Sequence, residues 1–356
     1  MKQTRMAKGG VTMVGADMAL AETEPIRLRL FDWWSRYARD LPWRFGRTTP
    51  WGVLVSEVMS QQTQMSRVVP YWTAWMKVWP DAASLAAAPK SEVITAWGRL
   101  GYPRRALRLQ ECAQQVAGQY ADRLPRDYDQ LVALPGIGDY TASAVMSFAY
   151  GERIAVIDTN IRRVLSRVFL GRESTGGAAS REERQLAWQV LPEDEGQESV
   201  SADAGGPEDV GAEDSGAQKD SDRLGLADPK VRSAAWREPP SARWNQAVME
   251  LGATVCIARK PACDICPLAG YCRFLKAGLP GLGAGRTRPR QRFAGTDRQV
   301  RGAILQALRQ ASGTPVSRKD LEPLCEDEIR LDRCIASLDE DGLLEIGQDG
   351  RLSLPQ

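Results

Sequence analysis

Residues 134–145, LPGIGDYTASAV, place two glycines one residue apart between two segments with helical patterns. A nucleotide-binding loop would need G-x-x-x-x-G-K-[ST] or G-x-G-x-x-G directly after a strand. Here the third glycine is missing, and the preceding residues, DYDQLVAL (127–134), follow a helical pattern. The stretch therefore does not predict a loop for a nucleotide cofactor.

The same glycines fit a hairpin between two helices. Pro135 ends the first helix, and Gly136 and Gly138 permit backbone conformations and close approaches that larger residues do not. The second helix begins near Tyr140, so its free N–H groups and the positive end of its dipole face outward. Such a helix start binds a phosphate of a DNA backbone without reading sequence. A plain tight turn between helices would show the same local pattern.

Composition and charge narrow the class of protein. The 356 residues are 43% hydrophobic and 26% charged, which is typical of a globular protein, and no apolar run is long enough for a membrane helix. The net charge of +2 conceals an acidic segment, residues 193–229, with twelve Asp or Glu against two Lys or Arg. The remainder of the chain carries +12, as expected of a protein that binds a polyanion. The absence of histidine excludes Ser-His-Asp and Cys-His catalysis and histidine-ligated metals.

The patterns along the chain predict an all-α protein with two helical subdomains and a small appended module. An apolar, β-branched segment at 153–157 gives a weak strand signal with no partner nearby. The predicted organisation is a disordered extension at 1–24, a helical core at 25–191 with the hairpin at 127–150, a disordered acidic insertion at 192–240, a helix and cysteine loop at 241–280, a basic linker at 281–296, and a winged-helix-like module at 297–356.

Two carboxylates lie in different sequence environments. Glu57 lies within an apolar helix, beside a polar stripe, where partial desolvation would raise its pKa and favour a general acid. Asp158 follows an apolar run and precedes a helix, whose free N–H groups favour the ionised form. One protonated and one ionised acid is the pair that glycosidic cleavage uses. Taken alone, a surface acid at Glu57 and a simple helix cap at Asp158 are the commoner interpretations.

Four of the seven cysteines form a cluster with C-x6-C-x2-C-x5-C spacing, at Cys256, Cys263, Cys266 and Cys272. Four thiolates can hold a cubane iron–sulphur cluster or a tetrahedral zinc ion, and the spacing alone does not separate these two. The other three cysteines are predicted to be core or unpaired thiols.

These elements, in this order, resemble the helix–hairpin–helix DNA glycosylases that carry an iron–sulphur cluster. The strings LPWR, SEVMSQQTQ, LGYPRRA, LPGIGDYTASA, VIDTNIRRVL and WNQAVMELGATVC resemble those of the adenine DNA glycosylases of the MutY type. The resemblance covers roughly residues 25–275, apart from the acidic insertion. It implies a [4Fe–4S] cluster on the four cysteines and double-stranded DNA with A·8-oxoguanine or A·G mispairs as the partner. We expect a monomer that acts in the bacterial cytoplasm at the nucleoid and has no contact with a membrane.

The resemblance also implies roles for single residues. Glu57 would protonate a flipped adenine, Asp158 would stabilise the cationic sugar, and Tyr140 and Asn160 would support this chemistry through hydrogen bonds. Base flipping requires side chains that enter the duplex, because the target bond is unreachable inside a stack. The predicted DNA-contacting residues are Arg44, Gln62, Thr63, Leu100, Tyr102, Gly136 and Gly138.

The chain departs from the family at Pro103, where a second tyrosine is common, and at its tail, where many relatives carry a Nudix-like domain that reads 8-oxoguanine. Tyr140 stands where an endonuclease III-like lyase has its Schiff-base lysine, so the sequence favours base removal without strand cleavage. A thymine or uracil mismatch glycosylase, an endonuclease III-like oxidised-pyrimidine glycosylase and a non-catalytic iron–sulphur DNA-binding protein are the alternatives.

Overall fold

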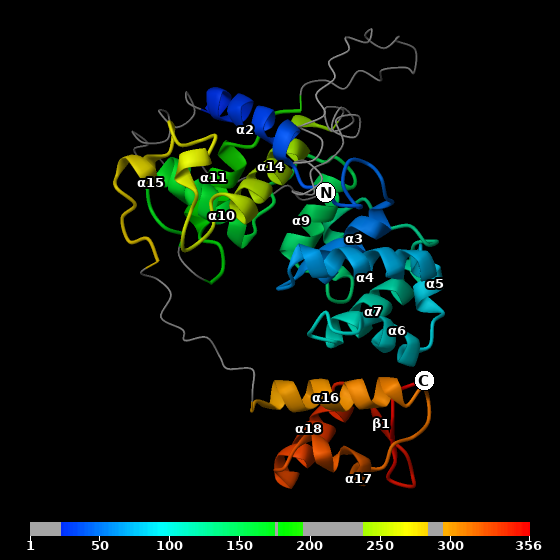
Figure 1. Ribbon diagram of the computed structural model, residues 1–356. Helices are drawn as coiled ribbons and strands as arrows, with labels where there is room; N and C mark the ends of the chain where they lie inside the picture. The colour runs from blue at the N-terminus through cyan, green and yellow to red at the C-terminus, as the bar shows by residue number, and fades with distance from the viewer. Residues whose placement is uncertain (1–22, 175–176, 195–237, 284–294) are drawn as a thin grey trace, which may run out of the picture. The chain divides into compact units, whose positions relative to one another are not determined.

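A computed structural model describes residues 23–174, 177–194, 238–283 and 295–356 (Figure 1). Residues 1–22 of the predicted extension, most of the acidic insertion and most of the basic linker lie outside these residues, while Thr23 and Glu24 belong to the first described helix. The described chain forms two units, one from residues 23–39 and 152–283 and the other from residues 40–151 and 295–356. Every helix among the described residues is too short or too polar to span a lipid bilayer.

The second unit is built around helix α3 (Pro50–Ser60), which is buried on almost every face. Thr49 caps its N-terminus by accepting a hydrogen bond from the Gly52 N–H, and Pro50 occupies the first turn, where its missing N–H has no cost. Around α3 pack α4 (Met65–Val78), α7 (Arg104–Gln119) and α9 (Asp139–Phe148), while α5 (Ala82–Ala86), α6 (Lys90–Trp97) and α8 (Tyr128–Ala133) complete the bundle.

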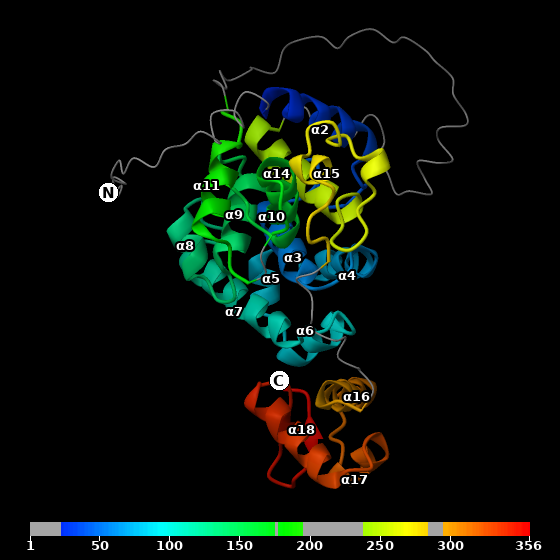
Figure 2. The ribbon, with the colours of Figure 1, turned by 90° about the vertical axis from the view of Figure 1, so that its left-hand side faces the viewer.

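The first unit packs α14 (Pro240–Thr254) between α2 (Thr23–Tyr37) and α10 (Thr159–Leu165). Figures 1 and 2 both show α10 and α14 side by side. Helix α10 continues as a π-helix, η1 (Ser166–Leu170), which contacts α15 (Arg273–Lys276), and α11 (Arg181–Gln189) packs against α10. A short 3-10 helix, η2 (Cys263–Ile265), lies within the cysteine loop. The fold therefore brings the helix after Asp158 against the helix that leads into the cysteines.

The C-terminal module has α16 (Asp297–Gln310), α17 (Arg318–Leu321), the 3-10 helix η3 (Glu322–Leu324), α18 (Glu328–Glu340) and a hairpin of β1 (Glu345–Ile346) and β2 (Leu352–Ser353). An isolated bridge from Val316 to Leu352 adds a third extended segment beside the hairpin. Its apolar core joins α16, α18 and the hairpin and also includes Ile94 of α6. Three helices followed by a small hairpin match the predicted winged-helix-like arrangement.

The predicted all-α fold with two helical subdomains is confirmed. The two units of the structure divide the chain at positions other than the predicted domain boundaries. The predicted core at 25–191 is divided, because α2 and residues 152–191 belong with α14 and the cysteine loop. The strand signal at 153–157 corresponds to a segment without regular secondary structure and not to a strand. The Asn245 side chain supplies the missing hydrogen-bond partner, since it accepts from the Val156 N–H at 3.4 Å and donates to the Ile154 carbonyl at 2.8 Å.

Candidate active site, DNA-contacting loops and cluster loop

Glu57 is held inside the second unit by the residue that follows the hairpin. Its side chain is buried within α3, with 9% of its surface exposed. The Tyr140 hydroxyl, from the first turn of α9, donates to Glu57 Oε2 at 2.7 Å. This distance is usual for a hydroxyl group that donates to an oxygen acceptor. The bond fixes the orientation of a buried carboxyl group across 83 residues of sequence.

Asp158 caps α10 in the first unit, as predicted. One carboxylate oxygen accepts from the Ile161 N–H at 2.6 Å, and the other accepts from the Asn160 side-chain amide at 2.8 Å. The cap favours the ionised form, as the sequence predicts, but burial acts in the opposite direction. Burial raises the pKa of Asp158, and the bonds from Ile161 and Asn160 and the charge of Arg163 only partly oppose that rise.

A single arginine connects this cap to α14. Arg163 donates to Asn160 Oδ1 at 2.8 Å, to the Gly252 carbonyl at 2.7 Å and to the Cys256 carbonyl at 2.7 Å. The helices approach closely at Gly252, where an added Cβ would lie 2.7 Å from Asn160 Cβ. Glycine is required there because of this close approach. The sequence gives no local signal for either Arg163 or Gly252 in these roles.

The glycine hairpin has the geometry expected of a phosphate-binding turn. Gly136 has φ +76°, a left-handed conformation that glycine adopts without steric cost, and a Cβ there would meet the Arg108 Cβ at 3.0 Å. Ile137 between the glycines is buried, whereas Gly136 and Gly138 are exposed. Gly138 is the N-cap residue of α9, so the free N–H groups of that helix begin at the exposed side of the turn.

Arg105, a residue that the sequence did not single out, joins the loop that carries Gln62 and Thr63 to the loop that carries Leu100 and Tyr102. Its guanidinium donates to the carbonyls of Val58 and Gln61, both at 2.7 Å, and to the Gly101 carbonyl at 3.0 Å. It also reaches the Thr63 hydroxyl at 3.3 Å. These bonds connect the end of α3 with the loop before α7. Burial lowers the pKa of Arg105 to about 10, which leaves it protonated at neutral pH.

The predicted DNA-contacting side chains differ in their accessibility. Gln62 and Tyr102 are exposed, and both have left-handed backbone angles, with φ +55° and +49°. Such angles are uncommon outside glycine and mark tight turns or functional strain. Leu100 and Arg44 are buried, at 3% and 9% exposure, so a contact between either side chain and DNA would require a local rearrangement. Tyr102 is not a core aromatic residue, because 43% of its surface is exposed.

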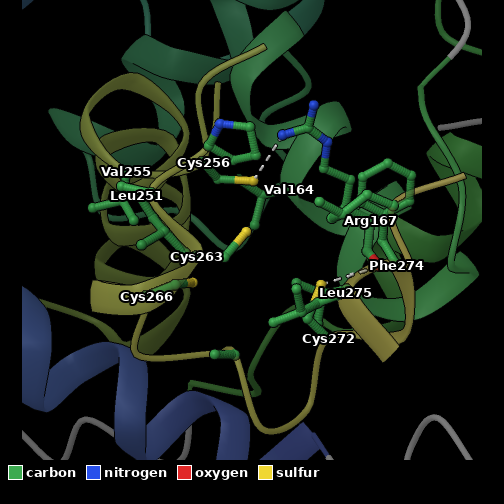
Figure 3. A pocket seen from close by; sticks show the side chains of 15 residues that line it. Val164, Arg167, Leu251, Val255, Cys256, Cys263, Cys266, Cys272, Phe274 and Leu275 are labelled. Atoms are coloured by element: carbon green, nitrogen blue, oxygen red, sulfur yellow. Dashed lines mark hydrogen bonds between the residues drawn. The ribbon is translucent and has the colours of Figure 1, made fainter. Parts of the chain in front are cut away.

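The four clustered cysteines line one cavity in the first unit (Figure 3). Its other walls are largely apolar and include Val164, Leu251 and Phe274. All seven cysteines of the chain are free thiols, so no disulfide competes for this set. Among the described residues, no three cysteine or carboxylate side chains are grouped so as to hold a single metal ion, and the four thiols instead surround the cavity.

The environment of these thiols suits a positively charged iron–sulphur core. Burial, with some repulsion from neighbouring cysteines, raises the pKa of Cys266 to about 12 and also raises the pKa of Cys272. A bound metal favours the thiolate form of such buried thiols. Arg167 from η1 donates to Cys256 Sγ at 3.4 Å and to the Ile257 carbonyl at 3.0 Å, so it orients the first ligand. Arg259 and Lys260 lie in the same loop, and both are exposed.

Comparisons with known proteins agree with this geometry. Residues 55–193 match the family model of the HhH-GPD superfamily of base excision DNA repair proteins, and residues 256–272 match the iron–sulphur binding domain of endonuclease III. A thermostable thymine-DNA glycosylase has a similar fold, with a TM-score of 0.54 and 23% identity over 72% of this chain and 98% of that one. Fold and site thus define a base-excision DNA glycosylase with a helix–hairpin–helix motif, and the four cysteines hold an iron–sulphur cluster, for which one thiolate per iron suits the [4Fe–4S] type.

Relatives that match most of the chain show to which family of glycosylases it belongs. An adenine DNA glycosylase of Mycolicibacterium smegmatis is 43% identical over 92% of this chain and 95% of its own length. The human adenine DNA glycosylase is 35% identical over 71% of this chain and 40% of its own length. The chain belongs to the adenine DNA glycosylase family. The unmatched 8% of the chain is shorter than the C-terminal module, so part of this module lies within the match to the mycobacterial protein.

Proposed function

We propose that the protein hydrolyses the N-glycosidic bond of adenine mispaired with 8-oxoguanine or guanine in duplex DNA, and that it does so without cleaving the strand. The observation that carries this proposal is the bond from Tyr140 to Glu57. It places a phenol and a buried carboxyl group together directly beside the DNA-phosphate hairpin.

Glu57 is the proposed general acid. A proton delivered to the adenine ring turns it into a neutral leaving group, and a buried carboxyl group oriented by one hydrogen bond is suited to that transfer. Asp158 is the proposed stabiliser of the oxocarbenium-like sugar that remains, and Asn160 holds this carboxylate by its 2.8 Å bond. Water then attacks the sugar, and the products are free adenine and an abasic site.

The absence of strand cleavage is inferred from the missing amine nucleophile. A glycosylase that also acts as a lyase attacks the sugar with an amine and forms a Schiff base. The sequence has no lysine between Lys90 and Lys219, a stretch that includes the whole hairpin and all of α9 and α10. Tyr140, in the first turn of α9, cannot form a Schiff base.

The exposed residues are the main proposed contacts with DNA. Gly136 and Gly138 would bind a phosphate through the start of α9, and Gln62 and Tyr102 would enter the duplex. Thr63 would contact the DNA at the junction of the two loops, where its hydroxyl donates to the Leu100 carbonyl at 3.3 Å. Leu100 and Arg44 remain proposed contacts that require the loops to open. We also propose that the protein acts as a monomer on nucleoid DNA in the cytoplasm.

The test is base release from duplexes that contain A·8-oxoguanine, A·G, T·G or thymine glycol, each analysed with and without alkali. We expect adenine release from the first two and strand breaks only after alkali. Glu57→Gln should abolish release, while Glu92→Gln, the same change at an exposed position of α6, should not. Release of thymine, or strand cleavage without alkali, would show that one of the alternative glycosylase activities is correct.

A further inference from the structure

The C-terminal module packs against α6 and α7 within the second unit. Ile94 of α6 belongs to the module's apolar core, and Arg309 of α16 donates to the Ile94 carbonyl at 3.2 Å. Arg104 at the start of α7 forms an ion pair with Asp341, at 3.2 Å. Between α16 and the loop that precedes α7 lies a cleft of about 1010 Å³. The cleft is therefore shared between the glycosylase bundle and the module.

The cleft is strongly basic. Of the twenty described residues that line it, seven are arginines, and one, Asp341, is acidic. Asp341 is already engaged by Arg104 and Arg301, which leaves most of the positive charge uncompensated. Within the described part of the chain, Arg99 and Arg298 form no ion pair. Burial, with a contribution from the neighbouring Arg99, lowers the pKa of Arg309, as expected where cations are crowded.

An exposed aromatic ring lies at this cleft. The Arg298 guanidinium of α16 lies over the Tyr102 ring, 4.7 Å from its centre, and Arg105 lies 5.5 Å from the same centre. An exposed aromatic side chain among arginines is the combination that binds nucleic acid strands, because bases stack on the ring while guanidiniums hold phosphates.

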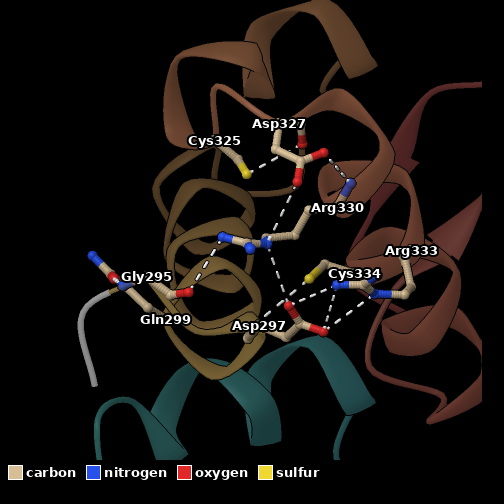
Figure 4. A network of polar contacts seen from close by, with 8 residues as sticks. All are labelled: Gly295, Asp297, Gln299, Cys325, Asp327, Arg330, Arg333 and Cys334. Atoms are coloured by element: carbon tan, nitrogen blue, oxygen red, sulfur yellow. Dashed lines mark hydrogen bonds and ion pairs between the residues drawn. The ribbon is translucent and has the colours of Figure 1, made fainter. Parts of the chain in front are cut away.

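Nearby acids of the module do not cancel this charge. Asp297, the neighbour of Arg298, accepts two hydrogen bonds from Arg333 Nη2, at 2.9 and 3.0 Å, and lies 3.6 Å from Arg330 (Figure 4). These contacts tie its carboxylate to α18. Gly302 of α16 also lines the cleft, and an added Cβ there would meet no atom within 4 Å. The cleft therefore has room for a side chain at position 302.

We propose that this cleft binds the phosphate backbone of the DNA substrate, with Arg298 and Arg99 as phosphate ligands supplied from its two sides. The module would then extend the DNA-binding surface beyond the hairpin and would place a phosphate contact beside Tyr102. This inference rests on the proposed function for the identity of the nucleic acid. It adds a binding site in a module that has no other assigned role.

Binding is measured by fluorescence anisotropy with a labelled duplex carrying A·8-oxoguanine, in the full chain with Glu57→Gln so that the substrate persists. The dissociation constant is followed from 50 to 200 mM salt, and circular dichroism checks the fold of each variant. Arg298→Ala and Arg99→Ala should each reduce the slope of log Kd against log salt by about 0.9, the value for one lost phosphate contact. The double variant should bind roughly tenfold more weakly, as expected when charge-assisted contacts are removed.

Matched variants separate the cleft from general charge effects. Lys319→Ala removes one exposed charge from the same module outside the cleft and should leave both Kd and slope unchanged. Gly302→Glu puts a carboxylate into the cleft and should weaken binding, whereas Gly302→Gln, of the same size, should not. If the Arg298 and Arg99 variants and Gly302→Glu all bind like their controls, the proposal is wrong.

Adenine release by the chain without substitutions, at saturating enzyme, is scored separately. A chain that releases no adenine but loses DNA affinity with Arg298→Ala would contradict the proposed function and support the cleft. A chain that releases adenine while the cleft variants bind normally would contradict the cleft alone.

Discussion

Gly252→Ala tests the helix crossing that supports Asp158. The new Cβ would lie 2.7 Å from Asn160 Cβ and 2.9 Å from the Asn160 carbonyl oxygen. Carbon atoms normally approach to roughly 3.5–4.0 Å, so α14 and α10 must separate by about 1 Å or Asn160 must move. Asn160 itself donates to Asp158 and accepts from Arg163, both at 2.8 Å, so its displacement disturbs the carboxylate.

Two effects of opposite sign set the change in stability. Overpacking a core costs about 1–3 kcal/mol, and replacing a helix-interior glycine by alanine returns about 0.5–1 kcal/mol. The net destabilisation is about 1–2 kcal/mol, and at roughly 2–4 °C per kcal/mol it lowers the melting temperature by several degrees. A displacement of about 1 Å at a catalytic group can cost on the order of 100-fold in rate, so we expect single-turnover adenine release to slow by roughly 10- to 100-fold.

Gly118→Ala is the matched control, because Gly118 lies exposed in α7 and an added Cβ there meets nothing within 4 Å. It should raise the melting temperature slightly and leave the rate unchanged. Differential scanning fluorimetry and single-turnover kinetics at saturating enzyme measure the two quantities. If Gly252→Ala melts at or above the original temperature and releases adenine at the original rate, the close approach of these helices does not support the site, and the reasoning fails.

Three further substitutions test the site itself. Because burial raises the pKa of Asp158, ionisation of this group in the folded chain costs stability as the pH rises through the raised pKa. Asp158→Asn should therefore abolish adenine release yet raise the melting temperature more at pH 7.5 than at pH 4. An equal change in melting temperature at both pH values would contradict this cause. Tyr140→Phe removes a hydrogen bond to the proposed acid Glu57, worth about 0.5–1.5 kcal/mol, and should slow release by up to about tenfold with duplex affinity nearly unchanged. A normal rate would exclude Tyr140 from orienting the acid. Arg105→Lys keeps the charge but loses the planar guanidinium that donates to several carbonyl groups, so duplex affinity and melting temperature should both fall. Unchanged affinity would show that these contacts between the loops do not support DNA binding.

The features that the sequence predicted correctly are those with a local cause. The cap at Asp158 and the glycine turn at Gly136 are set by residues within a few positions, and the cysteine spacing is contained in one loop. The raised pKa of Asp158, by contrast, has a cause that is not local. The helix N-terminus could be seen in the sequence, but the burial that outweighs it depends on tertiary packing.

Long-range contacts explain what the sequence could not supply. Arg105 binds carbonyl groups up to 47 residues away, and backbone carbonyls carry no signature in the sequence. Gly252 meets Asn160 across the crossing of two helices, which no periodicity predicts. The burial of Leu100 likewise depends on the surrounding fold, so its family resemblance alone did not indicate an inaccessible side chain.

The cluster loop and the cap at Asp158 form one hydrogen-bonded assembly. Arg163 and Arg167 lie one helical turn apart, and both reach the first cysteine ligand, Arg163 at the Cys256 carbonyl and Arg167 at its sulphur. Arg163 also holds Asn160, which holds the Asp158 carboxylate. An iron–sulphur cluster that fixes Cys256 therefore also fixes the N-terminal turn of α10. A bound cluster would thereby support Asp158 in its proposed role through two side chains, Arg163 and Asn160, without any electron transfer.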